Sequence, residues 1–172
     1  MADSETKTAE HQRQVLIAMD ESHHSDDAFD YYMKHVHRPD DHVVILYVPE
    51  YHNVIQSPMV MTDVAVVSDM MHEETERIKG VVSRLSKKLK NIGGSVKSIG
   101  GNPGEVIVKT SKDIGAAVII LGSRGMGTIR RTLLGSVSDY VMHHSHIPVL
   151  VCKHPDVHKH HGHKGSDPDH KH

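Results

Sequence analysis

Hydrophobic residues along this chain form five short runs, and between them apolar side chains recur every three or four positions. The runs occupy residues 15–19, 42–48, 95–99, 116–121 and 147–152. Four of them are almost continuously apolar, which is typical of strands buried on both faces of a parallel sheet. The run at 95–99 instead alternates with polar residues, which predicts an edge strand.

The segments between these runs predict four helices. The first has Ser22 or Ser25 as its N-cap. The second covers residues 62–91 and carries an apolar stripe that should face the core, formed by Val64, Val67, Met71, Ile78, Val81, Val82, Leu85, Leu89 and Ile92. The others follow the turn at 100–104 and occupy 136–146. This alternation predicts an α/β fold: a five-stranded parallel sheet with helices on both faces, a Rossmann-like sandwich with right-handed crossovers.

Both ends of the chain differ from the segment between them. Residues 1–12 and 154–172 contain too few apolar side chains to offset the entropy lost on ordering, so we expect a disordered N-terminal tail and a mobile, His-rich C-terminal tail. Residues 13–153 then form one compact domain, a size common for single domains.

Composition excludes several functional classes. Lys and Arg number 20 against 22 Asp and Glu, so no basic excess favours nucleic acid or an anionic membrane as a partner. Cys152 is the single cysteine, which excludes a disulfide framework and a Cys-rich zinc site. The polar N-terminus lacks a signal-peptide core, and the longest apolar run, residues 116–121, is far too short to span a membrane. We therefore expect a cytoplasmic protein.

The 18 histidines are the unusual feature of the composition. Several lie close together in the C-terminal tail, where neutral imidazoles bind transition metals. The candidates for weak metal chelation are His158, His160, His161 and His163.

Candidate chemistry lies where the predicted strands end, because open parallel sheets bind ligands beyond their carboxyl edge. Asp20, Val48 and Gly122 follow the first, second and fourth strands. From Gly122 the chain reads GSRG, and nine residues later GSVS begins a helix. Glycines without Cβ atoms, a helix N-terminus, serine hydroxyls and Arg124 together indicate a phosphate site. Thr128 stands where a Walker A motif needs lysine, so that motif is absent.

The chain from 13 to 152 resembles the universal stress protein family, in its ATP-binding branch. The resemblance rests on the first strand ending at Asp20, on the turn GNPG at 101–104, and on the segment LGSRGMGTIRRTLLGSVSDYVMHHSHIPVLV. It implies an adenine nucleotide alpha hydrolase-like fold and ATP bound across the first and fourth strands. Ala18 departs from the proline that family members often have there.

The resemblance also implies roles for particular residues. Asp20 would lie near the ribose or the metal, the Val48 backbone would meet adenine, and Mg or Mn would bridge the phosphates. Dimers would form through the last strand, from Ile147 to Cys152. The implied ATP-binding residues are Ala18, Met19, Asp20, Val48, Gly122, Ser123, Arg124, Gly125, Gly135, Ser136, Val137 and Ser138.

Three functions are compatible with these observations. The first is an ATP-binding, homodimeric regulator of the stress response. The second is a slow ATPase, although the motif supplies binding groups without an identifiable base or nucleophile. The third is a protein-interaction module with a vestigial nucleotide pocket. We predict no catalytic residue, and the sequence does not indicate the protein partners or the stress signal.

Overall fold

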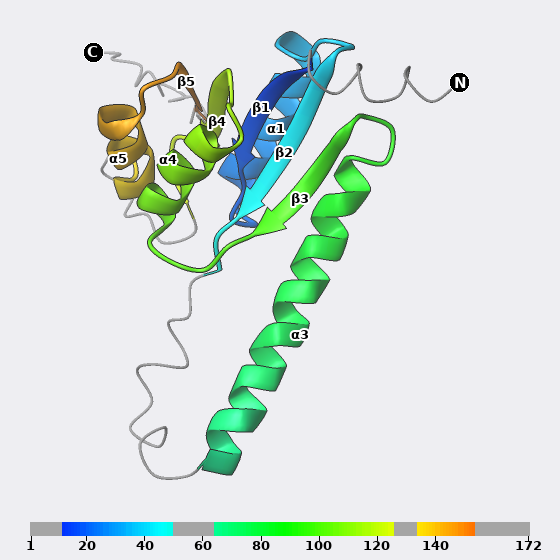
Figure 1. Cartoon of the computed structure of the whole chain (residues 1–172), viewed down its shortest axis with the longest axis vertical. Helices are drawn as coiled ribbons and strands as arrows, with labels where there is room; N and C mark the ends of the chain where they lie inside the picture. The colour runs from blue at the N-terminus through cyan, green and yellow to red at the C-terminus, as the bar shows by residue number, and fades with distance from the viewer. Residues whose placement is uncertain (1–11, 50–63, 126–133, 154–172) are drawn as a thin grey trace, which may run out of the picture.

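A single parallel sheet organises the computed structural model, which describes residues 12–49, 64–125 and 134–153 (Figure 1). Its strand order is β3-β2-β1-β4-β5, and every neighbouring pair is parallel. The predicted fold class is therefore confirmed, and β3 lies at a sheet edge as expected. The strands are β1 Arg13–Ala18, β2 Asp41–Tyr47, β3 Gly94–Ser98, β4 Val118–Gly122 and β5 Val149–Cys152.

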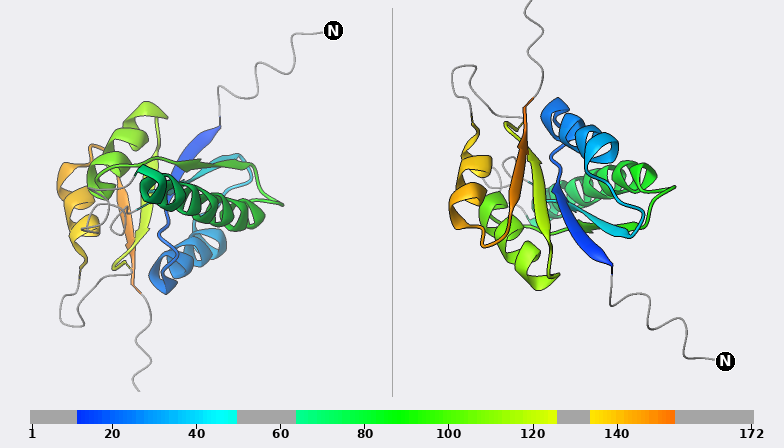
Figure 2. Two further views of the ribbon diagram at one scale, coloured as in Figure 1. Left: turned by 90° about the horizontal axis from the view of Figure 1, so that it is seen from below. Right: turned by 90° about the horizontal axis from the view of Figure 1, so that it is seen from above.

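Helices cover both faces of the sheet (Figure 2). One face carries α1 (His23–His35) and α3 (Val64–Lys88), and the other carries α4 (Pro103–Asp113) and α5 (Ser136–His144). The sheet divides the core in two, because successive strand side chains point to opposite faces. Val15 and Ile17 pack with α1 and α3, whereas Leu16 between them packs with α4 and α5. No helix among the described residues has the length and apolarity that a membrane span requires.

The start of α1 decides between the two predicted N-caps. Ser22 is the cap: its backbone is extended, and its Oγ accepts a hydrogen bond of 3.2 Å from the Ser25 N–H. Ser25 lies inside the helix, and its own hydroxyl donates back to the Ser22 carbonyl at 2.9 Å. The prediction of Ser22 is confirmed, and the alternative is wrong.

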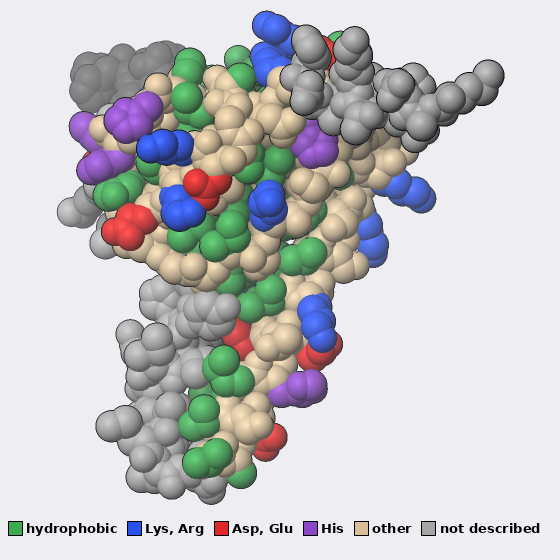
Figure 3. Space-filling model, viewed as in Figure 1, with side chains coloured by type: hydrophobic (Ala, Val, Ile, Leu, Met, Phe, Trp, Pro, Cys, Tyr) green, Lys and Arg blue, Asp and Glu red, His purple; other side chains and the backbone are tan. Residues whose placement is uncertain are grey.

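Helix α3 differs from its prediction. Val81, Leu85 and Leu89 are buried as expected, but Val64 is 88% and Met71 is 47% exposed. A 25-residue helix is roughly 37 Å long, whereas the five to seven residues of β2 and β3 span only about 17–23 Å. The first half of α3 therefore extends past the sheet, and Figure 3 shows hydrophobic side chains along it. The expectation that the whole stripe faces the core was wrong.

A buried ionic network fastens α1 to the amino edge of the sheet. The Asp41 carboxylate has no exposed surface and accepts hydrogen bonds from Arg13 Nε (2.6 Å), Arg13 Nη2 (2.7 Å) and the Tyr32 hydroxyl (2.7 Å). Burial alone would raise the pKa of Asp41, but hydrogen bonds from Arg13, Tyr32 and the Arg38 N–H lower it to about 2. Arg13 also donates to the Val36 carbonyl at the end of α1. Sequence reasoning did not identify this network.

Candidate functional site

The carboxyl edge of the sheet brings together residues that are distant in sequence. The chain proceeds from β1 outward through β2 to β3, then returns to β4 on the other side of β1. Loops after β1 and β4 therefore leave in opposite directions, and this switch point is where open α/β sheets are expected to form a ligand crevice. Asp20 follows β1 on one side of this crevice, and Gly122 ends β4 on the other. Val48 follows the neighbouring strand β2.

Asp20 supports the start of α1 and faces the loop after β4. Its Oδ1 accepts hydrogen bonds from the Ser22 N–H (3.1 Å) and the Ser22 hydroxyl (2.5 Å). Its Oδ2 lies so close to Gly125 that a Cβ at that position would be 2.6 Å away. Gly125 is thus needed for a close approach to Asp20, and the structure brings these two predicted site residues together.

The two halves of the glycine motif are joined by hydrogen bonds. The Gly135 N–H donates to the Ser123 carbonyl at 2.7 Å, and the Ser123 N–H donates to the Cys152 carbonyl of β5 at 2.8 Å. Ser138, which is 2% exposed, directs its Oγ at the carbonyls of both Ser123 (3.1 Å) and Gly135 (2.9 Å). The Ser138 hydroxyl therefore holds the motif together from inside.

Helix α5 begins without the side-chain cap found at two other helices. Ser22 caps α1 and Asn102 caps α4, whereas the N-cap of α5 is Gly135, which has no side chain to offer. By helix geometry, the N–H groups of the first turn, residues 136–138, have no acceptor within their own helix. The positive end of the helix dipole and these donors make the start of α5 favourable for an anion.

Gly122 has a packing role that sequence reasoning did not identify. A Cβ there would lie 2.7 Å from both the carbonyl carbon and the oxygen of His24. The absence of a side chain lets β4 approach the first turn of α1, so packing alone requires this glycine. The expectation that Gly122 also lines the phosphates is not tested by this packing and stays a prediction. At Gly135, a Cβ would meet Arg124 Cα and the Ser123 carbonyl oxygen at 3.4 Å, ordinary contact distances.

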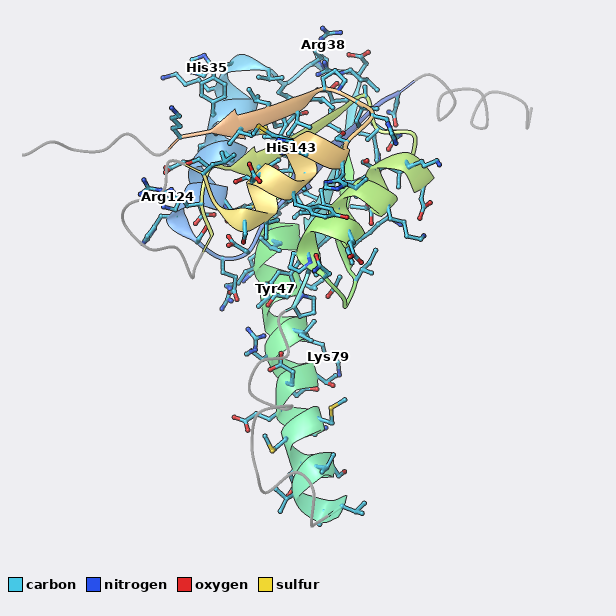
Figure 4. The ribbon with its side chains drawn as sticks, turned by 90° about the vertical axis from the view of Figure 1, so that its left-hand side faces the viewer. His35, Arg38, Tyr47, Lys79, Arg124 and His143 are labelled. Atoms are coloured by element: carbon cyan, nitrogen blue, oxygen red, sulfur yellow. The ribbon has the colours of Figure 1, made fainter. Side chains whose placement is uncertain are left out.

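The remaining predicted residues are placed as follows. Ala18 ends β1, and Met19 donates its N–H to the Leu46 carbonyl of β2 at 2.9 Å, so both belong to the strand end below the crevice. Arg124 is half-buried and lies at the periphery of the domain (Figure 4). Ser136 is exposed, and Val137 packs partly against the core.

Metal ligands are sparse in the part of the chain that the structure describes. No group of three or more His, Cys, Asp or Glu residues is arranged to hold an ion there. His143 and His144 instead direct Nδ1 at carbonyls one turn back in α5, those of Asp139 and Tyr140, both at 2.8 Å. The four tail histidines predicted as weak chelators lie outside the described residues.

One charged group at the same edge was missed by sequence reasoning. Glu21, next to Asp20, has a positive φ of 65° and forms ion pairs with Arg77 and Arg84 of α3. No local pattern marks these residues, because they lie far apart in sequence.

The strand order and the helices on both faces define a Rossmann-like α/β protein whose sheet has its switch point between β1 and β4. The model of the universal stress protein family matches residues 12–153. The chain therefore belongs to the universal stress protein family.

Curated relatives agree with this assignment. The universal stress protein MJ0577 of Methanocaldococcus jannaschii is 39% identical over 88 residues, which cover 50% of this chain and 54% of that protein. PHOS34 of Arabidopsis thaliana is 31% identical over 170 residues, covering 88% of this chain and 65% of its own length. The chain thus matches about half to two thirds of the length of these relatives.

Solved structures show the same fold. The MJ0577 structure superposes with a TM-score of 0.68 at 29% identity, covering 83% of this chain and 96% of that one. An Arabidopsis thaliana family protein with AMP bound gives a TM-score of 0.56 at 19% identity, covering 84% and 93%. A universal stress protein in complex with cAMP gives 0.57 at 20% identity, covering 81% and 96%.

Proposed function

We propose that this chain is an ATP-binding regulator of the stress response, with the nucleotide lying in the crevice between the ends of β1 and β4. The observation that carries the proposal is the start of α5. This helix begins on Gly135, which offers no side-chain cap, directly against Ser123 and Arg124. A triphosphate would supply the acceptors that the first-turn N–H groups lack. Adenine nucleotides bound to two relatives of the same fold support this choice of ligand.

Each side of the crevice has a distinct role in this proposal. Gly135, Ser136, Val137 and Ser138 cradle the phosphates with backbone N–H groups, Ser136 adds its exposed hydroxyl, and Ser138 holds the loop in shape. Gly122, Ser123, Arg124 and Gly125 line the ribose and phosphates, and the Arg124 guanidinium contributes positive charge. Asp20, Ala18 and Met19 close the β1 side, and the Val48 backbone meets adenine.

The residues proposed to line the nucleotide could hold a divalent ion only together with the phosphates of the nucleotide. Mg²⁺ is commonly held by one or two carboxylates together with phosphate oxygens and water. Asp20 is the carboxylate that follows β1, and no three-residue cluster that could hold an ion alone occurs in the described ranges. We therefore propose Mg²⁺ or Mn²⁺ bound by the ATP phosphates, with Asp20 on the metal or ribose side.

We further propose a homodimer formed through β5. This strand ends the sheet with apolar residues, and an uncovered apolar edge strand is prone to non-specific pairing. A hollow of about 410 Å³ lies beside it, between α1 and β5, lined by residues that include Tyr31, Lys34 and Leu150. Pairing of two β5 strands would extend the sheet and cover this edge.

The cytoplasmic location and the absence of nucleic-acid partners also stay predictions.

The nucleotide found in the purified protein separates this function from its alternatives. The protein is denatured directly after purification, and the released small molecules are identified by mass spectrometry. ATP supports a binding regulator, whereas ADP or AMP would indicate the slow ATPase. If no nucleotide is released and none binds in titration, the interaction module becomes the better account. No specific observation in the structure favours either alternative.

A further inference from the structure

Glu21 is a non-glycine residue in the left-handed region, at the turn that follows Asp20. Its φ is 65°, a conformation that residues with a Cβ seldom adopt. Such residues persist where the surrounding structure holds them, and they concentrate near functional sites. The contacts of the Glu21 side chain show what holds this one in place.

The Glu21 carboxylate is bound by two arginines of α3. One of its oxygens pairs with Arg84, and the other lies 3.7 Å from Nη1 of Arg77. Arg77 is itself oriented by Glu74, which accepts from Nε at 2.9 Å and from Nη2 at 2.6 Å. This two-point contact fixes the plane of the guanidinium, as a lysine could not. Glu74 and Glu21 are only 14% and 24% exposed, so both carboxylates are largely shielded from solvent.

Tyr47, at the end of β2, contributes to the electrostatic environment of Arg77. The pKa of Arg77 is raised above its usual range, first by the hydrogen bond with Glu74 and then by Tyr47. Figure 4 shows Tyr47 where α3 leaves the body of the domain. Tyr47 directly precedes Val48, and Glu21 directly follows Asp20. Arg77 is thus paired with Glu21, the neighbour of one residue that flanks the proposed nucleotide.

The same point on α3 separates its packed half from its projecting half. Ile78 packs against the core, whereas Met71, two turns earlier, is 47% exposed. On the N-terminal side of Ile78, α3 has no buried residue, and Arg77 pairs there with Glu74 of the same helix and with Glu21 of the turn after β1. Exposed ion pairs add little to the free energy of unfolding. We therefore expect the Arg77 pairs to affect the position of the projecting half of α3 more than the stability of the fold.

We propose that Arg77 is a positioning residue that, through Glu21, sets the end of β1 for nucleotide and couples nucleotide binding to the projecting half of α3. The inference rests on the proposed nucleotide site. Nucleotide that holds the turn after Asp20 also holds Glu21 against α3. By linkage, loosening that contact weakens nucleotide binding by the same factor.

Arg77→Met tests the coupling, and Lys79→Met is its matched control. Both remove one positive charge from α3, and both break an ion pair to a glutamate three residues earlier, Glu74 or Glu76. Lys79 pairs with Glu76 of its own helix at 2.8 Å. On the full chain, we expect Arg77→Met to raise the Kd for ATP–Mg about tenfold, within the usual range of coupling. Lys79→Met should change it less than twofold, and Arg77→Lys should recover part of the loss.

Hydrogen exchange distinguishes a positioning role from a purely structural one, because only a positioning role makes the exchange of α3 amides depend on nucleotide. In the wild type and in Lys79→Met, ATP–Mg should slow exchange of the amides at 64–76, and in Arg77→Met it should not. Glu21→Gln should act as Arg77→Met does, and the double variant should be no worse than either single one. If wild-type protein binds ATP and Arg77→Met binds equally well, the positioning role is wrong and the proposed function stands. If the wild type does not bind ATP, both fail.

Discussion

The hydroxyl of Ser138 lies 3.1 Å from the carbonyl oxygen of Ser123, so a helix residue holds the loop at the end of β4 in place. The same hydroxyl lies 2.9 Å from the carbonyl of Gly135. Ser136, two residues earlier, is exposed. The two serines of the GSVS segment therefore serve different purposes.

Replacing each serine by alanine should separate these purposes. Ser138→Ala removes a buried hydrogen bond, and we expect it to lower the free energy of unfolding by about 1 kcal/mol and to weaken ATP binding. Ser136→Ala should weaken ATP binding while the free energy of unfolding stays the same. Urea denaturation and calorimetric titration measure the two effects. An unstable Ser136→Ala or a fully stable Ser138→Ala would reverse the assignment.

Two glycine-to-alanine substitutions should shift stability in opposite directions. In Gly122→Ala the new Cβ meets the backbone of His24 at 2.7 Å, and we expect a loss of about 2 kcal/mol from overpacking. Gly80 lies within α3 with no atom within 4 Å of its Cβ position, so Gly80→Ala should gain about 0.5–1 kcal/mol from helix propensity. Thermal denaturation compares the two, and a tolerated Gly122→Ala would contradict the packing role.

The Asp41 network should dominate local stability at the amino edge of the sheet. Asp41→Asn leaves the Arg13 guanidinium without its anion, and we expect a loss of about 3 kcal/mol in the free energy of unfolding. Asp40→Asn, at the exposed neighbouring position, makes the same change of charge and should have little effect. Equal effects of the two substitutions would show that the network contributes nothing specific.

The Asp41 carboxylate should also make the free energy of unfolding depend on pH in the acid range. The pKa of Asp41 falls from 3.8 to about 2 on folding, so its contribution is present above pH 4 and is lost as the pH falls toward 2. A shift of this size corresponds to about 2 kcal/mol. The free energy of unfolding of Asp41→Asn should lack this part of the decrease between pH 4 and pH 2. Parallel acid profiles for the two proteins would contradict the prediction.

Dimerisation through β5 can be tested without breaking the sheet. The carbonyls of Pro148 and Cys152 accept hydrogen bonds from β4, so by the alternation of a strand the backbone of Val151 points outward. Val151→Pro removes an outward N–H, as edge strands tolerate, and should give a folded monomer. Leu150→Pro removes an inward N–H and should destabilise the fold. A dimeric Val151→Pro in sedimentation analysis would place the interface elsewhere.

The sequence allowed the sheet to be predicted, because apolar runs such as 42–48 report burial on both faces directly. It also placed Asp20 and Gly122 at one edge of the sheet, since parallel strands align their carboxyl ends there. The spacing of apolar residues could not show that α3 extends beyond the sheet. The stripe through Val64 and Met71 has the same spacing whether or not strands lie beneath it. Likewise, the pairing of Glu21 with Arg77 depends on how helices pack, which no local pattern encodes.

Titration of ATP–Mg against the wild type and Gly135→Asp tests the central claim most directly. Gly135 has an extended backbone (φ −78°, ψ 157°) that other residues adopt, and a Cβ there makes ordinary contacts. Aspartate is a favourable N-cap, so thermal stability should be unchanged or slightly raised, while its carboxylate takes the place of a phosphate. We predict that the wild type binds ATP and that Gly135→Asp loses at least about 100-fold in affinity. A stable Gly135→Asp protein with wild-type affinity would contradict the account.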